Sequence, residues 1–223
     1  VAEAYRLLRS RMQFFTKDAT APVILVTSSM PGEGKTYTAI NVASVYSLLG
    51  KKTILVGFDL RKPKIYEDFK LSNEKGVSTW LIGKDRLQDI IQETTFENLS
   101  VITAGPVPPN PSELTALGKT DELLSALKEK YEFIVIDSSP IGVVSDTFYL
   151  ASLADATLLV IRPGHSLRDM LELSLNEIKT SGTKNVGLII NDIMSDKKHY
   201  GSREAYGYIN EKKSKRFFIF KNG

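Results

Sequence analysis

The chain has 223 residues, 42% of them hydrophobic and 25% charged, so it can bury one sizeable core and belongs to the globular class. The absence of cysteine excludes disulfides, thiol catalysis and cysteine-ligated metals, and no apolar run approaches the roughly 20 residues that span a bilayer. The net charge is +3, but residues 197–223 carry eight Lys or Arg against two Glu, a net of +6 that leaves −3 for the rest.

Residues 1–15 have the spacing of an amphipathic helix. The predicted apolar face repeats every three or four residues and consists of Ala4, Leu8, Met12 and Phe15. The opposite face carries three charged residues spaced three apart, Glu3, Arg6 and Arg9. Such a row can pair with a neighbouring molecule. A helix packed on its own domain with a solvated charged face explains the same pattern, and the helix alone favours this second explanation.

The segment from Val23 to Thr36 is an apolar, β-branched run followed by a glycine-rich turn that closes on Gly34-Lys35-Thr36. It predicts a strand, a phosphate-binding loop and a helix that begins at the same corner. Lys35 is expected to neutralise phosphate charge and the Thr36 hydroxyl to ligate Mg²⁺. The backbone N–H groups expected to hold the phosphates belong to Gly32, Glu33, Gly34, Lys35, Thr36 and Tyr37. The common phosphate-loop pattern has glycine where this chain has Ser29. This difference restricts the families to which the loop can belong, but the prediction of a phosphate-binding loop stands.

Two further apolar runs end on an acid. Residues 52–58 lead to Asp59, and residues 133–136 lead to Asp137. Because ligands gather outside the carboxyl ends of parallel strands, both acids are expected beside the phosphate loop, where they would position Mg²⁺ directly or through water. An acid at the tip of a buried strand is costly unless a cation meets it. A structural ion pair between Asp59 and Arg61 is the competing explanation for the first acid.

The remaining chain alternates between apolar runs and helix-like segments, which predict strands at 99–104, 156–162 and 186–191 and a helix at 166–180. A capping box predicts another helix start at Asn110, Pro111 and Glu113. Residues 64–98 are polar and helix-prone, with breaks at Gly76 and Gly83, and indicate little about function, and Trp80 is assigned to packing. Nearly continuous apolar strands that alternate with helices indicate an α/β fold with a mostly parallel central sheet covered on both faces.

The C-terminal part differs from the rest, because three of the nine tyrosines lie close together among glycines and charges: Tyr200, Tyr206 and Tyr208. We expect residues 196–223 to be a flexible basic tail that offers these hydroxyls, and residues 1–195 to form one domain that begins with the helix of residues 1–16. A basic tail can touch nucleic acid or anionic lipid, but composition alone favours a solvated terminus. The chain begins at Val1, and we expect it to be a piece of a longer protein.

Four of these features together resemble the bacterial tyrosine kinase family, the cytoplasmic P-loop kinases of capsule and exopolysaccharide export. Residues 29–36 match that family's Walker A motif, 54–61 its Walker A′ motif and 133–140 its Walker B motif, and the row Glu3, Arg6 and Arg9 matches its ring-forming motif. Residues 108–114 and the tyrosine-bearing tail are supporting similarities. The resemblance covers nearly the whole chain and implies a P-loop NTPase-like three-layer sandwich.

The resemblance implies a kinase that uses ATP and Mg²⁺, releases ADP and autophosphorylates its tail tyrosines in trans. Its catalytic residues would be Lys35, Asp59 and Asp137, with Asp59 as the base for the tyrosine hydroxyl and Asn191 against the adenine. The implied partners are a ring-shaped homo-oligomer such as an octamer, a membrane adaptor or polysaccharide co-polymerase segment and a tyrosine phosphatase, but no nucleic acid. The implied location is the cytoplasm, at the inner face of the membrane.

One departure from the family concerns the Walker A′ motif, which usually has an acid two residues before Asp59, where this chain has Gly57. Asp59 must therefore do more, or the activity is weaker. The rival class is an ATPase switch resembling the Min and Par proteins, but these carry a signature lysine where this chain has Met30, and they lack the acceptor tail. A third interpretation is an ATP-gated scaffold. Only a kinase converts ATP into phosphotyrosine on the chain.

Overall fold

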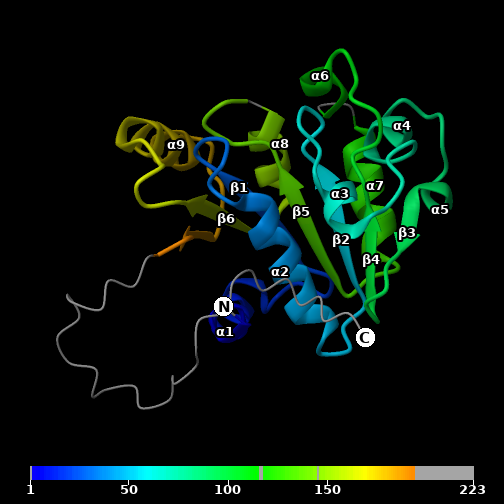
Figure 1. Cartoon of the computed structure of the whole chain (residues 1–223), viewed down its shortest axis with the longest axis horizontal. Coiled ribbons are helices and arrows are strands. Elements are labelled where there is room, and N and C mark those ends of the chain that lie inside the picture. The colour runs from blue at the N-terminus through cyan, green and yellow to red at the C-terminus, as the bar shows by residue number, and fades with distance from the viewer. Residues whose placement is uncertain (1, 116–117, 145, 194–223) are drawn as a thin grey trace.

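The computed structural model describes residues 2–115, 118–144 and 146–193, which form a sheet between two layers of helices (Figure 1). The strands lie in the order β3-β4-β2-β5-β1-β6-β7, and all neighbouring pairs are parallel except β3 with β4. The predicted α/β sandwich is confirmed. The strand bounds are β1 Val23–Ser28, β2 Thr53–Phe58, β3 Ile91–Glu93, β4 Leu99–Ile102, β5 Phe133–Ser138, β6 Ala156–Ile161 and β7 Val186–Ile190.

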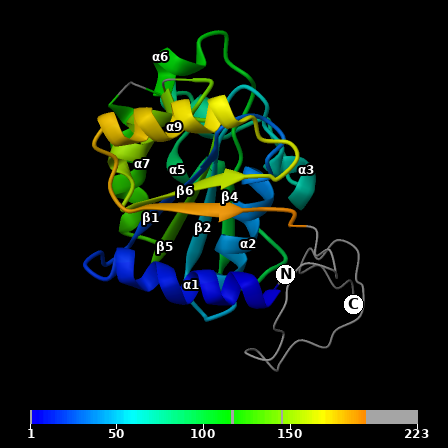
Figure 2. The same ribbon diagram turned by 90° about the vertical axis from the view of Figure 1, so that its left-hand side faces the viewer.

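The helices divide between the two faces of the sheet, as the separate hydrophobic clusters show. One face is covered by α1 Ala2–Thr16, α2 Lys35–Ser47 and α3 Ile65–Phe69. The other is covered by α4 Val77–Leu81, α5 Leu87–Ile90, α6 Pro111–Thr115, α7 Lys119–Lys128, α8 Asp146–Leu153 and α9 Arg168–Thr180. Figure 2 shows α1 and α9 on opposite sides of β6 and β7.

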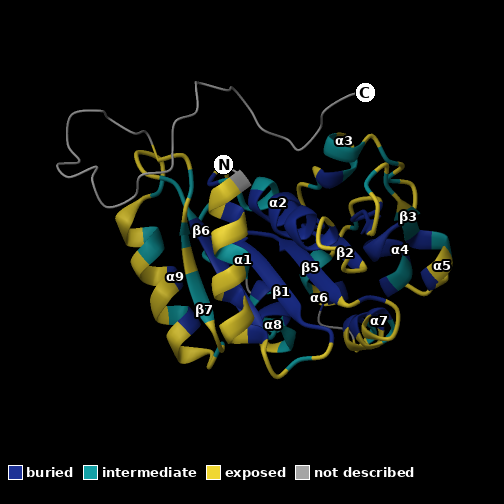
Figure 3. Ribbon diagram, turned by 90° about the horizontal axis from the view of Figure 1, so that it is seen from below, coloured by how far each residue is buried: buried dark blue, intermediate teal, exposed yellow. Residues whose placement is uncertain are grey.

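The three central strands are buried along their whole length, which explains their nearly continuous apolar sequences (Figure 3). Every residue of β1, β2 and β5 is buried, while β7 at the edge of the sheet is only partly covered. This arrangement fixes the carboxyl ends of β1, β2 and β5 side by side. None of the helices in the described part of the chain combines the length and hydropathy needed to cross a membrane.

The predicted apolar face of α1 is wrong at both ends. The buried residues of this helix are Tyr5, Met12 and Thr16, whereas Ala4 is exposed and Phe15 is 44% exposed. The reason is the packing against α2, where the Tyr5 ring meets the Tyr37 ring edge to face at 6.4 Å between centroids. A large aromatic ring buries more apolar area than the methyl group of alanine, so the helix turns Tyr5 inward.

Several elements were not predicted, namely β3, α7 and α8, whereas the helix-prone character of residues 64–98 is confirmed by the short helices α3, α4 and α5. The predicted start of a helix after Asn110 is confirmed, because α6 begins at Pro111 and the Asn110 amide donates to Glu113 Oε2 at 2.7 Å. The packing role of Trp80 is also confirmed, since its ring lies against the core and its Nε1 donates to the Lys119 carbonyl at 3.2 Å.

Candidate active site

The phosphate loop lies between β1 and α2 and has the backbone shape that its glycines predict. Gly32 and Gly34 have φ values of 88° and 95°, in the left-handed region that favours glycine. Helix α2 begins at Lys35, and no side chain caps its first turn at Gly34. The N–H groups of that turn therefore remain available for an anion, as a nucleotide phosphate requires.

Lys35 lies between the two acids that the sequence singled out. Its Nζ donates to Asp59 Oδ2 at 2.9 Å, and the two side chains are 14% and 8% exposed. Burial disfavours the ammonium, but the charges of Asp137 and Asp59 outweigh it and raise the Lys35 pKa. The structure thus brings Lys35 and Asp59 together at the end of the loop, and Lys35 stays charged there.

Asp59 is an ionised carboxylate with all its contacts in place. Its Oδ1 accepts hydrogen bonds from Ser139 Oγ at 2.9 Å, from Lys62 N at 3.0 Å and from Arg61 N at 3.3 Å. Burial raises the Asp59 pKa, but Lys35 and the hydrogen bonds from Lys62 N and Ser139 Oγ lower it by more, so the net shift is downward. The Arg61 guanidinium does not pair with Asp59, because it contacts Ser112 Oγ at 2.5 Å and Asp146 Oδ1 at 3.9 Å instead.

Asp137 is the less satisfied of the two acids. It is 2% exposed, and its Oδ1 has no hydrogen-bond partner among the described residues. Burial raises its pKa to about 6, although Lys35 and a hydrogen bond from the Thr36 side chain act in the opposite direction. An unpaired carboxylate oxygen beside a hydroxyl and a second carboxylate fits Mg²⁺, which prefers oxygen ligands. Thr36, Asp59 and Asp137 are therefore suitable residues to hold that ion.

The position of Gly57 also borders this site. Gly57 pairs with Asp137 across β2 and β5, and it lines a cavity of about 10 Å³ together with Asp59 and Asp137. A Cβ atom at Gly57 would lie 3.2 Å from Ala104 N and 3.4 Å from Ile65 Cδ1, so a larger side chain would need small shifts. No group of three or more His, Asp or Glu residues in the described ranges is arranged to hold a metal, and the site beside the loop offers two acids and a hydroxyl.

The other residues assigned to the nucleotide lie at the loop in different ways. Glu33 is fully buried, with its side chain inside the fold, so that only its backbone can reach a phosphate. Asn191 follows β7, and its Nδ2 donates to the Glu33 carbonyl at 2.9 Å. Tyr37 is partly buried in α2 against Tyr5. His165 and Ser166 belong to no predicted motif, because nothing in their spacing links them to the loop, and Ser139 lies within residues 133–140 but was assigned no role there.

The charged row of α1 is split by its packing. Glu3 and Arg6 form an ion pair at 3.1 Å on the surface, with side chains 78% and 61% exposed. Arg9 instead turns toward α2 and donates to the Val45 carbonyl at 3.3 Å. The phosphoacceptor residues predicted in the tail, Tyr200, Tyr206 and Tyr208, lie outside the described residues.

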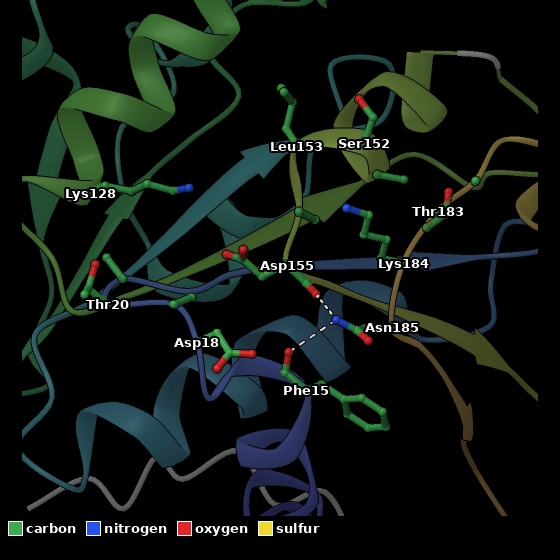
Figure 4. A pocket seen from close by; sticks show the side chains of 15 residues that line it. Phe15, Asp18, Thr20, Lys128, Ser152, Leu153, Asp155, Thr183, Lys184 and Asn185 are labelled. Atoms are coloured by element: carbon green, nitrogen blue, oxygen red, sulfur yellow. Dashed lines mark hydrogen bonds between the residues drawn. The ribbon is translucent and has the colours of Figure 1, made fainter.

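A larger pocket of about 560 Å³ lies at the opposite edge of the sheet, where β1, β6 and β7 begin (Figure 4). Its walls include Lys128, Asp155 and Lys184, none of which the motifs singled out. Asn185 crosses it and donates to the Asp155 carbonyl at 2.9 Å and to the Phe15 carbonyl at 3.3 Å. These contacts tie the ends of elements together, and the pocket is separate from the phosphate loop.

Comparisons with known proteins agree with this geometry. Residues 21–184 match the protein family described as an AAA domain. The tyrosine-protein kinase YwqD of Bacillus subtilis (strain 168) is 33% identical over 211 residues, which are 95% of this chain and 87% of the relative. The tyrosine-protein kinase etk of Escherichia coli (strain K12) is 32% identical over 192 residues, which are 86% of this chain but 26% of that longer relative.

Solved structures give the same picture. The kinase domain of Escherichia coli tyrosine kinase ETK superimposes with a TM-score of 0.82 and 32% identity, over 93% of this chain and 80% of that chain. The septum site-determining protein MinD of Pyrococcus horikoshii OT3, complexed with Mg-ADP, has a TM-score of 0.64 and 24% identity over 76% of this chain and 70% of that chain. At that identity the likeness to MinD concerns the fold alone.

Proposed function

The chain belongs to the bacterial tyrosine-protein kinase family, and we propose that it transfers the γ-phosphoryl group of ATP to tyrosine hydroxyls of its own C-terminal tail. The observation that supports this chemistry best is the buried, unpaired Oδ1 of Asp137 beside Lys35 and the phosphate loop. An ionisable oxygen without a partner is costly in the interior, and a magnesium nucleotide would satisfy it.

Each residue of the site has a part in the transfer. Backbone N–H groups of residues 32–37 bind the phosphates, and the Lys35 ammonium neutralises the developing charge on the transferred group. Thr36, Asp59 and Asp137 hold the ion directly or through water. When bound, Mg²⁺ adds positive charge at the phosphates. The tyrosine oxygen bonds to the γ-phosphorus, the bond to the β–γ bridging oxygen breaks, and ADP leaves.

Asp59 is the proposed base, and its present contacts indicate how it becomes available. Its Oδ1 is held by Ser139 and two backbone N–H groups, while among the described residues its Oδ2 accepts only from Lys35, at 2.9 Å. Phosphates compete for the Lys35 ammonium when ATP binds, and this frees Oδ2 to accept the tyrosine proton. Asn191 lies beside the loop, and its proposed role is to contact the adenine.

The proposed acceptors are Tyr200, Tyr206 and Tyr208, and the transfer takes place between subunits of a ring. A tethered tail reaches a neighbour's loop more easily than its own if a ring holds the two in place. Glu3 and Arg6 are exposed and can serve that interface, while Arg9 must leave Val45 to join them. In a head-to-tail ring the contacts are heterologous and close by rotation. Phosphates on the tail add nearly two negative charges each and favour release.

The proposed setting is capsular or exopolysaccharide synthesis at the inner face of the cell membrane. The Escherichia coli relative is much longer than this chain, so a membrane segment or a separate adaptor is the expected partner. A tyrosine phosphatase would reverse the modification. The charge of the tail suits a surface of anionic lipid.

Mass spectrometry of the full chain incubated with Mg-ATP tests the activity. We expect phosphate on tail tyrosines in the native protein and none in Lys35→Met. ATP hydrolysis without phosphotyrosine would overturn the kinase and favour a switch of the Min type, which shares this fold. Binding of ATP without turnover would favour a scaffold.

Light scattering tests the ring. Unphosphorylated Lys35→Met should form a closed oligomer, whereas the Glu3, Arg6 and Arg9 triple alanine variant and the fully phosphorylated protein should be monomers. Equal masses for all three samples would refute the coupling between phosphorylation and assembly, and would leave the chemistry of the loop untouched.

A further inference from the structure

Glu33 is an acid at the centre of a loop proposed to bind phosphate, where a negative charge would repel the ligand. Its side chain avoids this repulsion by pointing into the fold. The residue is 0% exposed, although its neighbours Gly32 and Gly34 are exposed or partly exposed. A carboxylate directed at the phosphates would repel them. Buried on the inner side of the loop, the carboxylate is removed from the anion and must find hydrogen-bond donors there.

The donors come from the beginning of the loop itself. Glu33 Oε1 accepts from Ser29 Oγ at 2.7 Å, and Oε2 accepts from Met30 N at 2.9 Å. Ser29 occupies the position at which the common phosphate-loop pattern has glycine. Its hydroxyl is buried and directed at Glu33, so the departure from that pattern has a structural reason. The Glu33 carboxylate thereby joins the first two residues of the loop to its fifth.

A third donor comes from a distant part of the chain. Ser166, in the turn between β6 and α9, also donates to Glu33 Oε1. The turn is itself ordered, because Arg162 N donates to Ser166 Oγ at 2.8 Å. No cationic side chain pairs with Glu33 in the ion pairs of the described residues. Three neutral donors therefore satisfy this carboxylate.

The same turn also reaches the outer side of the loop. His165 Nε2 lies 2.9 Å from the Pro31 carbonyl, and Asn191 holds the Glu33 carbonyl. A Cβ atom at Gly32 would lie 2.8 Å from His165 Nε2, and one at Gly34 would lie 2.1 Å from Asn191 Nδ2. The loop is thus enclosed by residues that lie more than a hundred positions later in the chain.

We infer that Glu33 is a positioning residue, whose carboxylate holds the phosphate loop in its binding shape through Ser29, Met30 N and Ser166 before the nucleotide arrives. This inference deepens the proposed function and rests on it for the identity of the ligand. A loop with two glycines is flexible, and ordering it on binding would oppose affinity. A preformed loop avoids that loss, so Glu33 acts on nucleotide binding and not on the transfer step.

Calorimetric titration of the full chain with Mg-ADP tests the inference, with the rate of phosphotyrosine formation at saturating ATP as the second measurement. Glu33→Ala should raise the Kd about tenfold or more, because buried donors are left without an acceptor. The rate at saturation should change by less than about threefold, since bound nucleotide restores the loop. Glu129→Ala, at an exposed position after α7, is the matched control and should leave the Kd unchanged.

Conservative and partner variants separate positioning from a general loss of structure. Glu33→Gln should bind Mg-ADP within about threefold of the native protein, because its amide oxygen can accept from Met30 N and its nitrogen can donate to Ser29 Oγ. Ser29→Ala removes one hydrogen bond to Glu33, and Ser166→Ala removes another together with the bond from Arg162 N; each variant should raise the Kd by about two- to fivefold. These milder variants decide the matter if Glu33→Ala fails to fold.

The results that would overturn the inference are distinct. An unchanged Kd in Glu33→Ala, or in both serine variants, would show that the carboxylate has no part in shaping the loop. A Kd for Glu33→Gln as high as that for Glu33→Ala would assign the effect to charge instead of geometry. If the native protein bound Mg-ADP but made no phosphotyrosine, the proposed function would fail while these Kd values still decided the role of Glu33.

Discussion

The two ends of the central parallel strands differ in what they hold. The amino edge is where these strands begin, and the carboxyl edge is where they end. At the amino edge, where strands begin, lies a pocket of about 560 Å³ with lysines and aspartates on its walls. At the carboxyl edge the hollow beside Asp59 and Asp137 measures only about 10 Å³. Volume alone would place the functional site at the amino edge, but the matched motifs of the chain lie at the other.

The difference lies in how the polar groups are used. At the amino edge Asp155 Oδ2 accepts from Val23 N at 2.8 Å, and Asn185 joins Asp155 to Phe15, so these side chains serve the backbone. At the carboxyl edge Asp137 Oδ1 has no partner among the described residues. Polar groups without partners in a buried place indicate chemistry better than an open cavity does, because such groups are kept at a cost in stability.

Replacing one lysine by methionine at each edge should give the largest difference in the rate of phosphotyrosine formation. Lys35→Met should lower phosphotyrosine formation by at least about a hundredfold, because it removes the ammonium that would neutralise charge on the transferring phosphoryl group. Lys184→Met, on the wall of the amino-edge pocket, should leave the rate within about twofold of the native protein. Kinetics with saturating Mg-ATP measure both, and an equal loss in the two variants would remove the contrast between the edges.

The two ends of α2 offer a second comparison, since Gly34 precedes the helix and Gly50 follows it, with φ values of 95° and 76°. Alanine is strained at both positions, by about 1 kcal/mol or more. At Gly34 the added methyl group would also meet Asn191, whereas at Gly50 nothing lies within 4 Å. Gly34→Ala should abolish Mg-ADP binding, and Gly50→Ala should lower only the melting temperature. Calorimetry and thermal unfolding separate the two effects.

The stability of the carboxyl edge should depend on pH through Asp137. Its pKa is raised from 3.8 to about 6 in the folded protein, so the folded state binds the proton more tightly than the unfolded chain. The free energy of unfolding therefore falls as pH rises from about 4 to about 6 and stays low above that range. Asp137→Asn cannot ionise, and should be more stable than the native protein at pH 7.5 by up to about 3 kcal/mol.

The measurement is urea unfolding of both proteins between pH 4 and pH 8, without nucleotide or Mg²⁺. The two curves should converge below about pH 4, where the native carboxyl is protonated. If Asp137→Asn raised the free energy of unfolding equally at every pH, removal of the buried charge would not be the cause of the added stability. If Asp137→Asn is more stable but inactive, the native carboxylate is retained for activity although it destabilises the fold.

The smallest expected effect on activity belongs to the amino edge. Asp155→Ala leaves the N–H of Val23 without its acceptor and should lower the free energy of unfolding by about 1–2 kcal/mol. The Kd for Mg-ADP should not change, because the variant is at the opposite end of β1. A weakened Kd without a change in stability would indicate that the amino edge takes part in nucleotide binding.

The sequence alone predicted six of the seven described strands and the side chains that come together beside the phosphate loop. A strand, two glycines and Gly34-Lys35-Thr36 follow one another in the chain, and each acid ends an apolar run. Such patterns are local, so chain order carries them. Strand β3 and helices α7 and α8 were not predicted from these patterns. Ala4 and Phe15 are exposed, contrary to the predicted face of α1, because the packing partner of a helix decides which side is covered.

Only the tertiary structure decided how the side chains of the site are supported. The Glu33 side chain turns inward and bonds to Ser166, which lies 133 positions later in the chain. Asp59 bonds to Ser139, which lies 80 positions later. The tertiary structure also directs the Arg61 guanidinium away from Asp59 and the Arg9 guanidinium toward the Val45 carbonyl. Contacts between distant residues leave no periodic trace in a single sequence, since any serine could supply the same hydroxyl. The chain order therefore determined which groups are the candidates for the reaction, and the packing of β6, β7 and α9 decided what holds the phosphate loop in place.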